Sequence, residues 1–191
     1  IATAHREIPC TTTMQFHLRN GALHMSVTMR SNDAYWGLPH DVFCFTMIQE
    51  MMARRLGAEM GEYHQYVGSM HVYEDYLPNM KQYVEEGFQQ TREMPPMSEG
   101  NPFDRIGQFL EIEKRLRDGE SIVAADEIDD SYWADILRLL QAFWIRKLVQ
   151  DYRPRLLELK AELACEFYAP YIEGRFHLNS HAMNAKDTHV V

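Results

Sequence analysis

The chain has 191 residues, 46% of them hydrophobic, which suffices for one folded domain with an appendage and excludes global disorder. Its formal net charge of −9 argues against nonspecific binding of nucleic acid, which needs a basic surface. Two or three local arginines can still bind one phosphate group. No apolar run reaches the roughly 18 residues of a membrane-spanning helix, so we expect no membrane partner.

Residues 12–29 form the first predicted element, a β-hairpin. Apolar and polar side chains mostly alternate along this stretch, and Asn20-Gly21 supplies a two-residue turn that tolerates positive φ. Residues 30–39 follow as a loop.

A helix is predicted next, from Pro39, a favourable first-turn residue, to Gly57, a favourable C-terminal cap. Its first half is apolar nearly all round, which is typical of a buried helix. Residues 63–76, rich in tyrosine and valine, predict a strand, and residues 77–90 a helix. Residues 1–90 therefore make a first, mixed α and β part.

The composition then changes. Residues 91–130 contain proline and glycine and are expected to form a linker with a short helix over 105–117. Residues 131–173 are predicted to be helical, because apolar residues recur there at helical spacing, and Pro154 divides the stretch. The polar tail, residues 174–191, is expected to be mobile.

Cysteine usage favours a reducing compartment. The three cysteines, Cys10, Cys44 and Cys165, are an odd number without CxxC spacing, which predicts neither a disulfide framework nor a metal site. No basic-then-apolar leader opens the sequence, so a cytoplasmic setting is expected. Cys44 and Cys165 stand in apolar helical stretches, where buried small side chains are the expectation.

Short polar motifs in the first 90 residues carry the chemistry. They are Pro9-Cys10, Gln15-Phe16, Arg30-Ser31-x-Asp33, Gly37-Leu38-Pro39-His40-Asp41 and His71-Val72-Tyr73. In this order and at similar spacing they resemble the motifs of thymidylate synthases, over about residues 8–90. The resemblance implies an α+β fold, with a mixed sheet, a buried helix against it and a helical C-terminal addition. It also implies a homodimer paired through its sheets, with methylenetetrahydrofolate as the one-carbon donor.

The resemblance assigns the nucleophile to Cys10. A pyrimidine ring is a poor nucleophile at C5, and a thiolate that adds to C6 turns C5 into an enolate-like or enamine-like carbon. That carbon can attack a one-carbon donor. Cysteine suits this task because its thiolate is strongly nucleophilic and departs readily.

The resemblance places the other motif residues on the nucleotide. Arg30 can pair with the phosphate through its planar fork, or its charge can stabilise a nearby thiolate. Ser31 would add a hydroxyl to the phosphate site, and the backbone of Asp33 would touch the base. His71 and Tyr73 would bind the ribose hydroxyl. Taken alone, the Arg-Ser-x-Asp loop also fits a capped turn, and the His-x-Tyr pair also fits cross-strand packing.

Asp41 departs from the asparagine of thymidylate synthases and resembles the aspartate of deoxycytidylate hydroxymethylases. Asparagine presents one donor and one acceptor that match O4 and N3–H of uracil. Cytosine reverses both demands, and a carboxyl group can accept from its 4-amino group and, when protonated, donate to N3. Asp41 therefore predicts a cytosine nucleotide, dCMP or CMP. The alternative is a charge near a helix N-terminus that interacts favourably with the helix dipole.

Other positions depart from the family pattern. Thr11, Met29 and His40 replace the histidine, glutamine and phenylalanine that are usual there, which indicates a remote branch. The phosphate loop, folate-contacting tryptophans, general-base glutamate and partner-subunit arginines of the family all precede its nucleophile. We therefore expect an upstream half or a partner chain to complete the site, and no turnover by this chain alone.

The leading functional hypothesis is a folate-dependent one-carbon transferase that acts at C5 of a cytosine nucleoside monophosphate, with a methyl or hydroxymethyl product. One alternative is a thymidylate synthase that converts dUMP to dTMP. Another is a non-catalytic nucleotide-binding or interaction module on the same scaffold, in which the apolar C-terminal helices form a partner surface.

Overall fold

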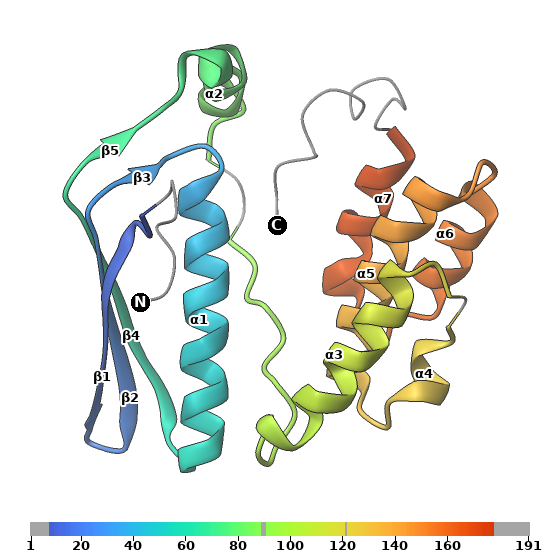
Figure 1. Ribbon diagram of the computed structural model, residues 1–191, viewed down its shortest axis with the longest axis horizontal. Coiled ribbons are helices and arrows are strands. Elements are labelled where there is room, and N and C mark those ends of the chain that lie inside the picture. Colours follow the sequence, from blue (N-terminus) through green and yellow to red (C-terminus); the bar gives the residue numbers. More distant parts are fainter. Residues whose placement is uncertain (1–7, 89–90, 121, 178–191) are drawn as a thin grey trace. The chain divides into compact units, whose positions relative to one another are not determined.

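The computed structural model describes residues 8–88, 91–120 and 122–177 (Figure 1). The chain divides into two compact units. The first comprises the residues up to 91 with 99–102, and the second comprises residues 92–98 and those from 103 onward. None of the helices in these described ranges combines the length and apolar character that crossing a membrane requires.

The first unit opens with the predicted hairpin. Strands β1 (Thr11–Arg19) and β2 (Ala22–Met29) pair antiparallel. Asn20 and Gly21 between them have φ values of 51° and 81°. Two consecutive positive φ angles give a turn whose twist matches that of the flanking strands. The hairpin prediction is confirmed.

Helix α1 (Gly37–Leu56) connects this hairpin to strand β4 (Glu59–Val67) and packs against the sheet (Figure 1). It ends where predicted, because Gly57 takes the left-handed conformation with φ 62°. Strand β4 pairs parallel with β2, so the three-stranded sheet is mixed, with the order β1-β2-β4. The predicted α+β class with a mixed sheet is confirmed.

The strand predicted over residues 63–76 is in fact two shorter strands. Strand β4 ends at Val67, and β5 (Met70–His71) pairs parallel with β3 (Asn32–Asp33) in a separate two-stranded sheet. The chain then enters a 3-10 turn (Glu74–Tyr76) and helix α2 (Leu77–Glu85).

The core of the first unit lies between α1 and the facing side of β2. Four side chains form its buried centre, with Cys10, Tyr63 and Val67 packed at its margin. The four are Met25, Val27, Met29 and Phe45. This cluster adjoins the segment that carries Cys10, so the core supports the candidate nucleophile directly.

Only one side of α1 is buried in this chain. Phe45, Gln49 and Ala53 face the sheet, whereas Phe43 is 48% exposed and Cys44 is exposed. The expectation that Cys44 is a buried small hydrophobe is therefore wrong. The sheet covers one stripe of the helix, and an apolar pattern all round a helix does not tell which stripe that is.

The second unit is helical, as predicted for the C-terminal addition. Its core comprises Ala142, Leu156, Leu159 and Ile172. Its elements are α3 (Phe103–Arg117), α4 (Ala124–Glu127), α5 (Ser131–Leu148), α6 (Arg153–Ala161), a 3-10 turn (Glu166–Tyr168) and α7 (Ala169–His177).

Two predictions for this unit concern its helix boundaries. Pro154 stands in the first turn of α6, where its missing N–H costs nothing, so it begins a helix after the expected break. Helix α7 includes residues 174–177 of the predicted tail, and residues 178–191 lie outside the described residues.

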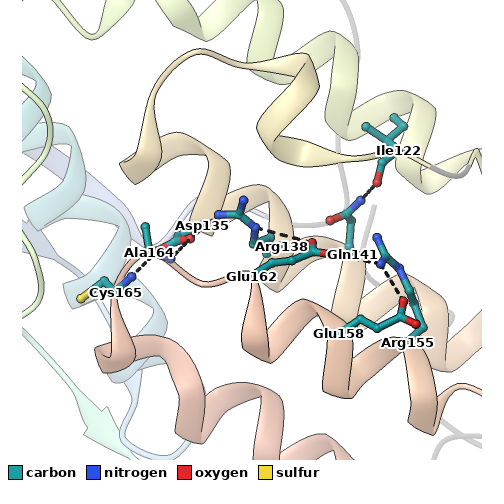
Figure 2. A network of polar contacts seen from close by, with 9 residues as sticks. All are labelled: Ile122, Asp135, Arg138, Gln141, Arg155, Glu158, Glu162, Ala164 and Cys165. Carbon is teal, nitrogen blue, oxygen red and sulfur yellow. Dashed lines mark hydrogen bonds and ion pairs between the residues drawn. The ribbon is translucent and has the colours of Figure 1, made fainter.

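A buried polar network holds part of the second unit together (Figure 2). Asp135, 1% exposed, accepts hydrogen bonds from Arg138 Nη1 at 2.6 Å and from the backbone N–H groups of Ala164 at 3.0 Å and Cys165 at 2.9 Å. One carboxylate thereby joins α5 to the segment that follows α6. We assign this network to the scaffold, since its charges pair with each other and with nearby backbone.

Candidate functional site

The predicted nucleophile and its arginine are held together at one end of the sheet. Cys10 immediately precedes β1, is half-buried, and packs against the core cluster. Arg30 immediately follows β2 and donates two hydrogen bonds to the segment that carries Cys10. Its backbone N–H donates to the Cys10 carbonyl at 2.9 Å, and its Nη2 donates to the Ile8 carbonyl at 2.9 Å. The guanidinium therefore fixes the backbone that carries the thiol.

The pairing of β3 with β5 brings together the next motif residues. Asp33 lies opposite His71 in the register, and Ser31 Oγ lies 3.3 Å from His71 Nδ1, with the donor set by the imidazole tautomer. Tyr73 packs its ring edge-on to His71, with 5.0 Å between the ring centroids. Residues 40 positions apart in the chain thus form one polar cluster.

The Asp33 side chain caps the turn that leads into α1. Its carboxylate accepts from the backbone N–H groups of Tyr35 at 3.2 Å, Trp36 at 2.7 Å and Gly37 at 3.2 Å. Burial alone would raise the pKa of Asp33, but these three donors and the nearby His71 outweigh it and hold the pKa below its usual value. The capped-turn interpretation therefore describes this side chain, and a contact of its backbone with a base stays a prediction.

The pKa of Asp41 is shifted in the opposite direction. It lies half-buried near the start of α1, and burial raises its pKa, although a hydrogen bond from the Asn32 side chain and the charge of His40 partly offset this. Its negative charge in turn adds to the effect of burial on Tyr63, whose pKa rises to about 12. Asp41 thus keeps its proton to higher pH than an exposed aspartate does.

The arrangement combines a cysteine whose backbone segment is hydrogen-bonded to an arginine, a hydroxyl beside an imidazole, and a carboxyl group with a raised pKa. Arg30, Ser31 and Asp33 lie within four consecutive residues, and the backbone of Cys10 is hydrogen-bonded to that of Arg30. Sequence reasoning passed over Asn32. The only available signal was a polar residue inside the Arg-Ser-x-Asp motif.

The comparisons with known proteins decide the family. A family model described as thymidylate synthase matches residues 3–109, more than half of the chain. The chain belongs to the thymidylate synthase family. Members of this family are one-carbon transferases, and their donor is methylenetetrahydrofolate.

Individual relatives match the first part of the chain. A thymidylate synthase of Bacillus atrophaeus is 40% identical over 73 residues, which are 38% of this chain and 32% of the relative. A deoxyuridylate hydroxymethyltransferase of Bacillus phage SP01 is 46% identical over 71 residues, which are 37% of this chain and 18% of the relative. The chain thus spans a third or less of the length of these curated relatives.

One solved structure is also similar to part of this chain. It is the thermostable thymidylate synthase A of Bacillus subtilis, at 36% identity and a TM-score of 0.40, with 44% of this chain and 30% of that chain covered.

Proposed function

We propose that the protein that carries this chain transfers a one-carbon unit to C5 of a pyrimidine nucleoside monophosphate, with Cys10 as the nucleophile. The observation that carries this proposal is the pair of hydrogen bonds, each 2.9 Å long, that Arg30 donates to the carbonyl groups of Cys10 and Ile8. A nucleophile on a backbone held in place can meet C6 of a bound ring at a reproducible angle and distance.

In this proposal the Cys10 thiolate adds its electron pair to C6, and C5 becomes the carbon that forms the new bond. Loss of the C5 proton and departure of the thiolate then restore the ring. Methylenetetrahydrofolate, when bound, would supply the one-carbon unit as the bond from that carbon to the folate nitrogen breaks. A hydride from the folate would complete a methyl group, and a water molecule would complete a hydroxymethyl group. The side chains described above are suited to a phosphate, a sugar and a base edge. The resemblance places the folate contacts before Cys10, so we assign the donor to residues other than these.

We assign the phosphate to Arg30 and Ser31. The Arg30 side chain is exposed and uses Nη2 on the Ile8 carbonyl, which leaves other N–H donors of its planar fork for an anion. Ser31 lies beside Arg30 in the chain and carries a hydroxyl. His71 and Tyr73, in edge-on contact, are the proposed ribose ligands, with the Asp33 backbone close to the base.

The finer proposal is that the base is cytosine, as dCMP or CMP. Burial raises the pKa of Asp41, so the carboxyl group retains a proton into a higher pH range. A protonated carboxyl group offers one donor to N3 and one acceptor to the 4-amino group. This is the order that cytosine requires and uracil does not.

A uracil nucleotide is the second candidate. Two relatives favour it, because their names specify thymidylate synthesis and deoxyuridylate hydroxymethylation. Both candidates share the chemistry at C5 and differ in the base edge that Asp41 would read.

The test measures tritium release from C5-labelled dCMP, CMP and dUMP with methylenetetrahydrofolate, using the full natural protein. We expect release from a cytosine nucleotide and a fall of about 1,000-fold or more in Cys10→Ala. Cys44→Ala is the matched control, because Cys44 is also a free thiol and lies on α1, and it should retain release. Asp41→Asn should shift the kcat/KM ratio toward dUMP by about 100-fold.

The outcomes separate the candidates. Release from dUMP alone would keep the C5 chemistry and reject cytosine. No release from any nucleotide, with the protein folded, would favour a non-catalytic binding module. Equal loss of release in Cys44→Ala and Cys10→Ala would remove the special role of Cys10.

A further inference from the structure

Strand β1 contains one residue more than the facing part of β2 at the end that adjoins the candidate nucleophile. Thr13 pairs with Thr28 and Thr11 pairs with Met29, so Thr12 has no partner of its own in the register. An extra residue of this kind forms a β-bulge, which bends the strand locally and is common beside active sites. The bulge therefore lies where it can influence the candidate site.

The bulge decides which residue of β1 meets Arg30. A regular ladder continued from Thr13 would place Thr11 opposite Arg30. In the structure, the Cys10 carbonyl accepts the Arg30 N–H instead, at 2.9 Å. The bulge thus brings Cys10 to the position that Thr11 would otherwise occupy, a shift of one residue or about 3.4 Å along the strand.

Arg30 itself is held from the other side of β2. Met29, which precedes it, pairs with Val67 of β4, and the Met29 carbonyl accepts the Gly68 N–H at 2.9 Å. A Cβ atom at residue 68 would lie 3.0 Å from the Arg30 carbonyl oxygen, so glycine allows the two backbones this close approach. The end of β2 is fixed by β4, and the register of β1 decides which residue lies beside it.

The Thr12 side chain holds the bulge in place. Its Oγ1 donates to the Thr28 carbonyl at 2.8 Å, so the residue without a strand partner is still tied to β2. Thr11, Thr12 and Thr13 have the same shape and the same β propensity, so side-chain shape distinguishes poorly between registers that differ by one residue. The hydrogen bond from Thr12 supplies that distinction.

We propose that Thr12 is a positioning residue for the nucleophile, whose hydroxyl locks the β-bulge that sets Cys10 beside Arg30. This inference rests on the proposed function, in which the Cys10 thiolate adds to C6 of the ring. A misplacement of about 1 Å can cost about 100-fold in rate, and a register slipped by one residue would move Cys10 farther than that.

The experiment compares Thr12→Val with Thr12→Ser in the full natural protein, by tritium release from the C5-labelled nucleotide that the wild type uses. Valine keeps the β-branched shape of threonine but removes the donor, so kcat should fall about tenfold, the population shift that one lost hydrogen bond can cause. The KM for the nucleotide should change by about twofold or less, because the proposed phosphate ligands Arg30 and Ser31 are not on β1. Thr12→Ser keeps the hydroxyl and should restore release.

Thr13→Val is the matched control. Thr13 is the next exposed threonine of β1, and its hydroxyl makes no hydrogen bond within the part of the chain that the structure describes. Its loss should leave kcat and KM unchanged. Thermal melts verify that each variant is folded.

Alkylation by iodoacetamide, read at each cysteine by mass spectrometry, gives a measurement that does not depend on turnover. Cys10 is half-buried against the core cluster, whereas Cys44 is exposed on α1 and serves as the internal reference. A slipped register takes Cys10 off the margin of the core. The alkylation rate of Cys10 relative to Cys44 should therefore rise about threefold or more in Thr12→Val and stay unchanged in Thr13→Val.

Deletion of Thr12 tests the register itself. Without the extra residue, a regular ladder again places Cys10 opposite Arg30, so the deletion variant should release tritium faster than Thr12→Val does. A deletion variant slower than Thr12→Val would contradict the register argument.

The remaining outcomes separate this inference from the proposed function. Unchanged kcat and alkylation in Thr12→Val, with release still lost in Cys10→Ala, would reject Thr12 and leave the proposed function intact. Equal losses in Thr12→Ser and Thr12→Val would show that the hydroxyl is not the cause. Release that survives in Cys10→Ala would remove the proposed function, and this inference with it.

Discussion

Asp33 and Asp41 are near neighbours in the chain whose pKa values move in opposite directions. Asp33 receives three backbone N–H donors, which favour the carboxylate, whereas Asp41 is governed by burial, which disfavours it. The difference suits their proposed tasks. An ionised Asp33 holds the turn before α1, and the raised pKa of Asp41 favours the protonated form that the proposed contact with a cytosine base requires.

Asp33→Asn tests how much the ionised Asp33 side chain contributes to stability. The folded-state pKa of Asp33 is lowered, so its contribution to stability is present above the unfolded value of about 3.9 and is lost as the pH falls through the folded value. Asn keeps one acceptor oxygen but loses the charge and the second acceptor, so we expect it to lower the free energy of unfolding by about 0.5–1 kcal/mol at pH 7, and by less near pH 3. Thermal melts across this pH range provide the measurement. A deficit independent of pH would contradict the assignment, and Glu59→Gln, at an exposed position, is the control.

Gln49 links helix α1 to the sheet of the first unit. It is fully buried on α1, and its Nε2 donates to the carbonyls of Leu23 at 2.8 Å, Gly61 at 3.1 Å and Glu62 at 3.3 Å. The register of β2 and β4 shifts between Leu23 and Met25, in the same region. One amide therefore joins the helix to both strands where their pairing is irregular.

We expect Gln49→Leu to destabilise the protein by about 1–3 kcal/mol, because it leaves buried carbonyls without their donor. Urea unfolding measures the loss. Ile48→Ala is the matched control, since Ile48 is 39% exposed on the same helix and its change should cost about 0.5 kcal/mol or less. Similar losses in the two variants would argue against the proposed tie between helix and sheet.

The whole molecule consists of two units with separate cores. Asp135 belongs to the second unit and the candidate site to the first. Asp135→Ala would leave Arg138, 6% exposed, as a buried charge without its close partner. We expect a loss of about 3–5 kcal/mol in the unfolding of the second unit.

Hydrogen exchange tests this prediction, because it measures the protection of backbone amides in each unit separately. Amides of α5 and α6 should lose protection in Asp135→Ala, while those of β2 and α1 keep theirs. Arg155→Ala, which removes exposed ion pairs of α6, is the control and should cost about 1 kcal/mol or less. Equal loss of protection in both units would show that they unfold as one.

The sequence by itself determined the local features and the family. Asn20-Gly21 predicted the hairpin turn, Gly57 predicted the end of α1, and the ordered motifs predicted the thymidylate synthase family. These signals are readable because they depend on the φ and ψ preferences of single residues, or on short runs of residue types. The roles assigned to the seven site residues remain predictions.

Only the tertiary structure decided which distant groups meet. The parallel pairing of β3 with β5 brings Ser31 to His71, and the packing of α1 brings Gln49 to the carbonyl groups of Leu23 and Gly61. It also decided that Cys44 faces outward. Such contacts join residues that are close in space but separated along the chain. Their selection depends on the packing of whole elements, which no local preference of the chain encodes.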